Sequence, residues 1–246
     1  MRFFYSGIRS LRELNLLRQI HAQYYLIDYF DYFKMRRWFY DIDCIVLDSG
    51  AYKMSRGKGN RTIDDYLNLA LTRDFFAVIA PDVVGDNQAT YQNWLYSLGF
   101  LTDRGQQLPL VPVWQYCEDI TLLEYYLSIA SVVGIGGLVG HFRNNDYAVL
   151  NRLGELVKAY PQRLHLFGLN WMLAYSLLQP WTYSADTTKW LCGFKTRRVI
   201  YLDRQGYLDI APAKVLGLDL TPEQMCQISA INLREYAPPE LFEIGS

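Results

Sequence analysis

The sequence predicts an α/β fold in which parallel strands close into a (β/α)8 barrel. Short apolar segments recur along the chain, and each ends in Gly, Asp or Gln before a loop and an amphipathic helical stretch. The segments are nearly continuous in apolar residues rather than alternating, as strands covered on both faces of a parallel sheet are. A strand followed by a helix seven times or more indicates right-handed βα units.

Seven strands follow from this pattern. They are predicted at residues 3–5, 44–47, 75–80, 110–114, 132–135, 164–167 and 182–185. An eighth strand is less clear, because residues 198–202 fit either a barrel strand or one arm of a hairpin with residues 207–210. Without an eighth strand, a doubly wound open sheet fits the pattern as well as a closed barrel. No long linker interrupts the chain, so residues 1–246 are expected to form a single domain.

The helices between the strands carry start signals. Ser10 and Thr62 each precede an acidic residue three positions later, as in a capping box. Asp146 begins an apolar-periodic stretch that stops before Pro161, and Thr221 precedes a proline that suits the first helical turn. One more helix is predicted from four apolar residues at helical spacing, Tyr91, Trp94, Leu95 and Leu98.

Composition excludes several classes of protein. Hydrophobic residues make up 51% of the 246 residues, which is ample for a core and excludes global disorder. The net charge of -1 argues against a coat of positive charge, although it allows a local basic patch. The four cysteines are too widely spaced for a zinc knuckle and indicate reduced thiols, hence a cytoplasmic protein. We expect no membrane span and no signal peptide.

Polar residues and glycines follow the predicted strands. They are Asp48, Asp82, Gln115, Gly136–Gly137, Gly168 and Asp186. In a parallel barrel the carboxyl ends of all strands share one face, so these groups are expected to converge on one pocket. At any single position Asp and Gly are ordinary turn or cap residues, but that explanation weakens for the whole set.

The amino-acid sequences of three segments resemble motifs of the tRNA-guanine transglycosylase superfamily. They are Leu47-Asp48-Ser49-Gly50-Ala51-Tyr52, Gly134-Ile135-Gly136-Gly137-Leu138 and Ser184-Ala185-Asp186-Thr187-Thr188-Lys189-Trp190. Residues 112–115, which end in glutamine, and residues 165–169, around a glycine, match two further strands of that superfamily. The resemblance covers about residues 43–190, in the same order and at barrel-like spacing.

The resemblance implies exchange of a base in a nucleic acid through a covalent intermediate. By resemblance, Asp186 is the nucleophile that attacks C1′ of the ribose and Asp48 is the general acid and base. Asp82 and Gln115 then read the edge of a guanine-like base. This division suits the residue types, because a carboxylate is a stable anionic nucleophile and two carboxylates in one pocket push their pKa values apart.

The remaining base-binding groups are also carried over from the resemblance. Backbone N–H groups of Gly136, Gly137 and Leu138 are expected near the base, with Gly168 beside them and the Tyr52 ring able to stack on it. A target nucleotide must be turned out of a helix before its C1′ can be reached, which predicts basic residues at the pocket mouth. The candidates are Lys53, Arg56, Lys58, Arg61, Lys189, Lys195, Arg197 and Arg198. The alternative for these residues is a solvated loop surface.

The chain departs from the tRNA-acting enzymes of the superfamily in three ways. The zinc-binding Cys and His set after the nucleophile is missing, no glutamate closely follows the Gly136–Leu138 segment, and the chain is much shorter. These departures indicate the compact branch of the superfamily, which resembles the transglycosylases that insert 7-deazaguanines into DNA in phage and bacterial modification systems. The resemblance therefore implies no metal or cofactor, DNA as acceptor with tRNA as the alternative, and preQ0 or a derivative as the incoming base.

Two other functions stay open from the residues alone. One is a different barrel enzyme, such as a lyase or hydrolase of a small sugar or phosphorylated compound. The other is a non-catalytic nucleic-acid-binding relative. His165 is expected to be structural, and Ser49 lacks the setting of a hydrolase nucleophile. The segment 22–42, rich in aromatic and basic residues, fits a helix, a lid or a nucleic-acid contact. The sequence does not indicate an oligomeric state.

Overall fold

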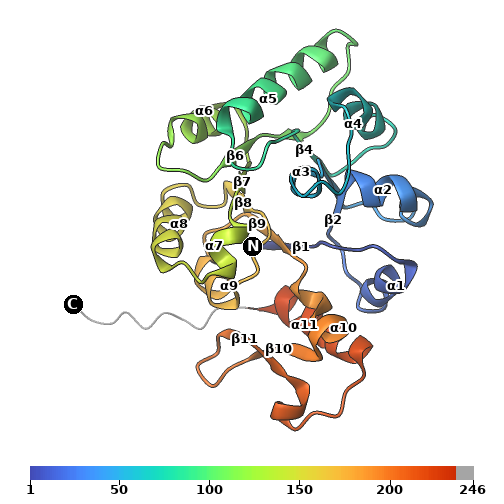
Figure 1. Ribbon diagram of the computed structural model, residues 1–246, viewed down its shortest axis with the longest axis vertical. Helices are drawn as coiled ribbons and strands as arrows, with labels where there is room; N and C mark the ends of the chain where they lie inside the picture. The colour runs from blue at the N-terminus through green and yellow to red at the C-terminus, as the bar shows by residue number, and fades with distance from the viewer. Residues whose placement is uncertain (237–246) are drawn as a thin grey trace.

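A computed structural model describes residues 1–236 of the chain. Its main feature is one sheet of parallel strands with helices arranged around it (Figure 1). The strands of this sheet are β1 (Arg2–Tyr5), β2 (Tyr25–Asp28), β3 (Ile45–Asp48), β4 (Ala77–Ile79), β5 (Leu110–Val111), β6 (Val113–Gln115), β7 (Val133–Gly136), β8 (Leu164–Leu166) and β9 (Ser184–Thr187). Their order is β5-β4-β3-β2-β1-β9-β8-β7-β6.

The sheet closes into a barrel at Pro112. β5 pairs with β4 and β6 pairs with β7, and Pro112 alone separates β5 from β6. Proline has no N–H to donate to a neighbouring strand, so the hydrogen-bond ladder is interrupted at this residue. The chain nevertheless continues in the same place, between β4 and β7. The nine strands therefore occupy eight positions, because β5 and β6 together fill one of them. The predicted (β/α)8 barrel is confirmed and the open sheet is excluded.

Helices cover the outside of this barrel. They are α1 (Leu11–Gln19), α2 (Tyr29–Met35), α3 (Ala51–Ser55), α4 (Ile63–Ala70), α5 (Asn87–Thr102), α6 (Thr121–Ile129), α7 (Val139–Arg143), α8 (Tyr147–Ala159), α9 (Met172–Leu178), α10 (Cys192–Thr196) and α11 (Pro222–Glu235). Three single turns of 3-10 helix, η1 (Arg36–Trp38), η2 (Lys189–Leu191) and η3 (Ala213–Leu216), complete the set. None of the helices within residues 1–236 is both long and apolar enough to cross a membrane.

The predicted start signals cap four of these helices. Ser10 accepts from the N–H of Glu13 at the start of α1, and Asp146 accepts from Val149 in α8. Thr62 of α4 and Thr221 of α11 form complete capping boxes, in which the third residue also bonds back to the backbone of the cap. These local bonds satisfy N–H groups that a helix start leaves without partners.

Residues 198–202 are not the eighth barrel strand, and the alternative of a hairpin with residues 207–210 is confirmed. The missing barrel strand is β2, within the segment 22–42, and that segment continues directly into α2. Residues 198–202 form β10 (Arg198–Leu202), which pairs antiparallel with β11 (Leu208–Pro212) outside the barrel and contacts α11 (Figure 1). Asp28 explains why β2 is hard to see: it ends the strand and its side chain also caps α2, so no loop separates the two elements.

The predicted face of α5 was also only partly right. Trp94 is buried, but Leu95 and Leu98 are exposed. Thr90 and Ser97 are buried in their place, with their hydroxyls bonded to backbone carbonyls of the same helix. Small polar residues can therefore line a buried helix face when their hydroxyls are satisfied locally, which an apolar pattern does not reveal.

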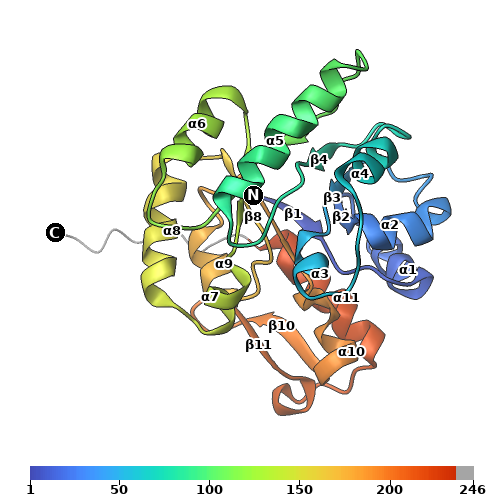
Figure 2. The same ribbon diagram turned by 45° about the horizontal axis from the view of Figure 1, so that its top comes forward.

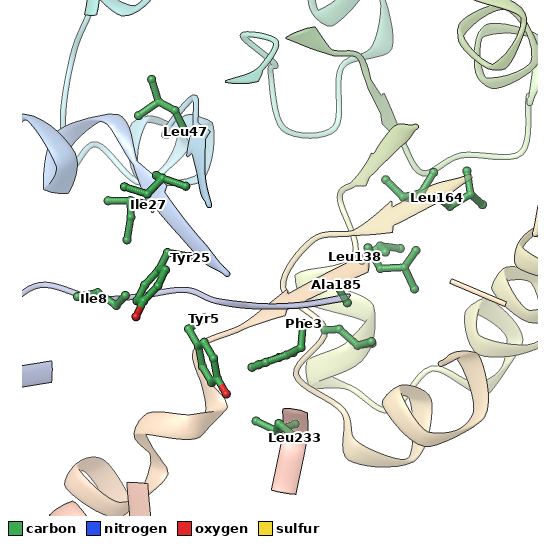
Figure 3. Close-up of a cluster of buried hydrophobic side chains, with 14 of the residues drawn as sticks. Phe3, Tyr5, Ile8, Tyr25, Ile27, Leu47, Leu138, Leu164, Ala185 and Leu233 are labelled. Carbon is green, nitrogen blue, oxygen red and sulfur yellow. The ribbon is translucent and has the colours of Figure 1, made fainter. Parts of the chain in front are cut away.

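Alternate residues of the strands divide the core into two layers. Side chains of one set meet inside the barrel, namely Phe4, Leu26, Val46, Ile79 and Val113. Residues between them point outward toward the helices, as Tyr5, Tyr25, Ile27 and Leu47 do in Figure 3. Because side chains alternate along a strand, a residue two places after an inward-facing one also faces inward. This rule decides which residues at the strand ends reach the barrel mouth.

Candidate active site

Polar side chains end four strands on the inward face of the barrel. Asp28, Asp48 and Gln115 each stand two residues after an inward-facing apolar residue, and Asp28 lies beside Asp48 in register. Asp186 lies beside the inward-facing Phe4 on the neighbouring strand. Three carboxylates and one amide are therefore directed into the carboxyl end of the barrel, which is the functional face of parallel barrels.

Asp82 and Gln115 form a fixed hydrogen-bonded pair. The Asp82 carboxylate accepts from the Ser49 hydroxyl at 2.7 Å and from Nε2 of Gln115 at 2.9 Å. Oε1 of Gln115 accepts from the N–H of Gly85 at 3.1 Å, and Asn87 bonds to both backbone groups of Gln115. The structure thus brings together two predicted base-reading residues and adds Ser49 and Asn87 as their supports.

The hydrogen-bonded pair of Asp82 and Gln115 requires a glycine at position 136. A Cβ at this position would lie 2.5 Å from Nε2 of Gln115, so the glycine makes room for the Gln115 side chain. Gly137 is exposed in a turn at φ +79°, a conformation that favours glycine, and the Leu138 side chain is fully buried in the core. Of the three predicted groups, Gly137 is the one that offers an open backbone surface.

Burial and charge raise the pKa of Asp48 to about 8. Burial is the main cause, the neighbouring carboxylates of Asp82, Asp28 and Asp186 add to it, and a hydrogen bond from the Gly50 N–H at 3.1 Å opposes it. Burial also raises the pKa of Asp82, against the hydrogen bonds that it accepts. This raised pKa favours the protonated form of Asp48 at neutral pH.

Asp186 is held from two sides. Its Oδ1 accepts from the Gly168 N–H at 2.9 Å and lies 3.6 Å from Nε2 of His165. Gly168 has φ +64°, and a Cβ there would lie 2.8 Å from the Val139 side chain, so this loop needs glycine. His165 is buried, its Nδ1 lies 2.8 Å from the Ser184 hydroxyl, and its Nε2 has no hydrogen-bond partner among the described residues.

The predicted basic residues fall into two groups. Lys53 forms ion pairs with Asp28 and Asp31 at 2.8 and 2.7 Å, and Arg61 donates to the Ser49 carbonyl at 2.7 Å while its guanidinium lies over the Tyr66 ring. These two are engaged by the protein itself. The other six lie at the surface after β3 and β9, namely Arg56, Lys58, Lys189, Lys195, Arg197 and Arg198. The predicted Tyr52 ring is also exposed, on α3.

Two site residues escaped sequence reasoning. Asp28 was missed because β2 was missed, although Tyr25-Leu26-Ile27-Asp28 repeats the form of Ile45-Val46-Leu47-Asp48. That repetition was the available signal. His165 was interpreted as structural, and only the fold reveals that the inward-facing positions of β8 and β9 bring it beside Asp186.

The Tyr66 hydroxyl joins β3, which ends in Asp48, to β4, which precedes Asp82. It lies 2.9 Å from the Leu47 carbonyl and 2.7 Å from the Ile79 carbonyl, fully buried. Tyr66→Phe is expected to lower the free energy of unfolding by about 1–3 kcal/mol, because buried carbonyls lose their donor. Urea denaturation measures this change. Tyr96→Phe, whose exposed hydroxyl contacts Asp64, is the control, with an expected change within about 0.5 kcal/mol. Equal losses would contradict this role for Tyr66.

Nothing in the described part of the chain gathers three or more His, Cys, Asp or Glu side chains as a metal ion would require. No protein-family model matches the chain, and no curated protein matches it.

Proposed function

We propose that the protein is a transglycosylase that exchanges guanine in a nucleic acid for a 7-deazaguanine. The observation that carries this proposal is that Asp48 and Asp186 both end strands on the inward face of the barrel, at one mouth, with different partners. Asp48 has a pKa of about 8, whereas Asp186 accepts from the Gly168 N–H and lies 3.6 Å from Nε2 of His165. The exchange requires a proton donor and a nucleophilic carboxylate at one mouth.

The first half of the reaction expels guanine. A carboxylate oxygen of Asp186 forms a bond to C1′ while the bond from C1′ to N9 of guanine breaks, and the electron pair of that bond goes to the base. Asp48 donates its proton to the leaving base, so guanine departs neutral. The nucleic acid is then held as an ester of Asp186.

The second half runs in the opposite direction with the new base. N9 of the incoming 7-deazaguanine attacks C1′ and gives its proton to the Asp48 carboxylate. The bond between C1′ and the Asp186 oxygen breaks, which restores the Asp186 anion. Asp48 returns to its acid form, so the two carboxyls finish the cycle as they began it.

Asp82 and Gln115 are proposed to recognise the base. Each carboxylate oxygen of Asp82 accepts one internal hydrogen bond and keeps a further lone pair for the N1–H and amine of a guanine-like ring. The Tyr52 ring, exposed on α3 just after the Asp48 strand, is proposed to stack on the base. DNA is the proposed acceptor and tRNA the alternative, with preQ0 or a derivative as the incoming base. The four free cysteines support a cytoplasmic setting.

Base exchange is tested directly with the wild-type protein. DNA and tRNA acceptors carrying labelled guanine are incubated with preQ0 or unlabelled guanine, and release of label is followed. Release from one acceptor is expected, together with a protein–nucleic-acid adduct that survives denaturation. If neither acceptor loses label and no adduct forms, the proposal is wrong, and hydrolysis or lyase activity on small sugars becomes the alternative to assay.

His165 is proposed to position the Asp186 carboxylate. Its Nδ1 lies 2.8 Å from the Ser184 hydroxyl and its Nε2 lies 3.6 Å from Oδ1 of Asp186, so the ring can present an N–H to that carboxylate. His165→Phe is expected to lower kcat about tenfold with little change in KM, the cost of a weak interaction with a charged group. His165→Gln, which keeps a donor near the Nε2 position, should restore part of this loss. If Phe and Gln reduce kcat equally, packing rather than positioning explains the residue.

A further inference from the structure

A cleft of about 760 Å³ opens beside the candidate site. It lies between α7 and the β10–β11 hairpin, which are found on the same side of the molecule in Figure 2. Thr188 and Lys189, which directly follow β9, and Asn170 also line it. The Asn170 side chain accepts from the Thr187 hydroxyl at 2.7 Å, next to Asp186 in the chain. The cleft therefore begins within two residues of the proposed nucleophile.

Four cations line this cleft without partners. They are Arg143, Lys189, Lys195 and Arg198. Within residues 1–236 none of their side chains takes part in an ion pair, a hydrogen bond or a cation–π contact, whereas Lys53, Arg61 and Arg163 are all engaged elsewhere. Unpartnered cations that gather around one concave surface favour an anionic ligand.

The two acidic residues of the cleft are already used by the hairpin. Asp203 accepts from the N–H groups of Gln205 and Tyr207, both at 2.9 Å, and so shapes the turn between β10 and β11. Asp209 accepts from the Tyr201 hydroxyl at 3.0 Å. These bonds stabilise the hairpin as one wall of the cleft, and four cations against two carboxylates leave the cleft with net positive charge.

Aromatic rings complete the lining. Trp171 and Tyr207 are both half-buried there, so part of each ring is open to the cleft. Positive charge combined with aromatic faces is how proteins hold unpaired nucleic acid, with phosphates on the cations and bases on the rings. The volume lies in the range of sites that hold small ligands, which suits an unpaired segment of a few nucleotides better than a double helix.

We infer that this cleft binds the unpaired strand segment next to the exchanged nucleotide. The inference rests on the proposed function for the kind of ligand, and it adds the path of the strand and its single-stranded form. Arg143 on α7 and Lys195 on α10 contact phosphates, and Tyr207 or Trp171 stacks on one neighbouring base. Recognition of the target nucleotide then depends on local melting of its surroundings.

Fluorescence anisotropy with a labelled single-stranded oligodeoxynucleotide tests this inference. The double variant Arg143→Ala/Lys195→Ala is compared with Lys34→Ala/Lys214→Ala, which removes the same charge from exposed residues outside the cleft lining. The cleft variant is expected to bind about tenfold more weakly at low salt. Its plot of log affinity against log salt is expected to be shallower by about 1.4, because each lost phosphate contact on a single strand accounts for about 0.7. Thermal unfolding checks that both variants stay folded.

The outcomes separate the inference from the proposed function. Equal affinity and slope in the two double variants, or tighter binding of the matching duplex than of the single strand by the wild type, would overturn the inference even if base exchange occurs. Loss of single-strand binding in the cleft variant alone, in a protein that exchanges no base, would support the cleft and reject the transglycosylase proposal.

Discussion

Asp186→Asn is expected to abolish base exchange, with a loss of about a thousandfold or more in kcat/KM and no detectable covalent adduct. An amide is neutral and is not a nucleophile toward C1′, and it stabilises no positive charge there. The fold is expected to survive, because the Asn oxygen can still accept from the Gly168 N–H, which bonds to Asp186 at 2.9 Å. Adduct formation on a denaturing gel and release of labelled guanine measure the two effects.

The matched control for Asp186→Asn is the same substitution at an exposed aspartate whose side chain has no partner in the described part of the chain. Asp43 is exposed and its side chain makes no hydrogen bond or ion pair within residues 1–236, so Asp43→Asn should exchange base at the wild-type rate. Full exchange by the Asp186 variant would reject Asp186 as nucleophile. If the adduct then disappeared in the Asp48 variant instead, the roles of the two carboxyls would be reversed.

The strands that could be predicted from the sequence are those that form an apolar run bounded by turn residues. β3, β4 and β7 have such runs, and burial on both faces of the barrel wall is the physical reason for them. β2 has the same composition but passes into α2 through Asp28 without a loop, so a pattern that depends on turns missed it. Residues 198–202, the candidate for the eighth barrel strand, do form a strand, β10. It belongs to a hairpin packed on α11 and not to the barrel, and composition alone does not distinguish the two.

The candidate site could be predicted from sequence only where a residue's place after a strand decides whether it reaches the barrel mouth. Asp48, Asp82, Gln115 and Asp186 were predicted because each follows a strand, and parallel strands end on one face of a barrel. The partners of these residues depend on side-chain geometry that sequence does not carry. Gln115 over Gly136 and His165 beside Asp186 arise from strand register, which becomes known only when the barrel is closed.

The pH dependence of exchange tests Asp48 most sharply. Formation of the adduct needs the acid form of Asp48, and its pKa of about 8 keeps that form dominant at neutral pH. The rate is therefore expected to be level from neutral pH up to about 8 and to fall about tenfold for each pH unit above it. Asp48→Asn should lower the rate by about 10²- to 10⁴-fold and remove this dependence. A wild-type rate that instead rises through pH 8 would show that Asp48 acts first as a base.

The same pKa predicts that the inactive variant is the more stable protein. An ordinary Asp in the unfolded chain loses its proton near pH 3.9, whereas Asp48 in the folded protein keeps it up to about pH 8. Between these values the folded state binds more protons, so this carboxyl makes the free energy of unfolding fall as pH rises. Asp48→Asn removes that slope. Urea denaturation is expected to find the variant close to wild type near pH 4 and more stable by several kcal/mol at pH 8, because each pH unit between the two pKa values contributes about 1.4 kcal/mol, whereas Asp43→Asn follows wild type at both. A variant less stable than wild type at pH 8 would mean that the Asp48 anion is stabilised in the folded barrel, and the proton donor of the first step would have to be sought elsewhere.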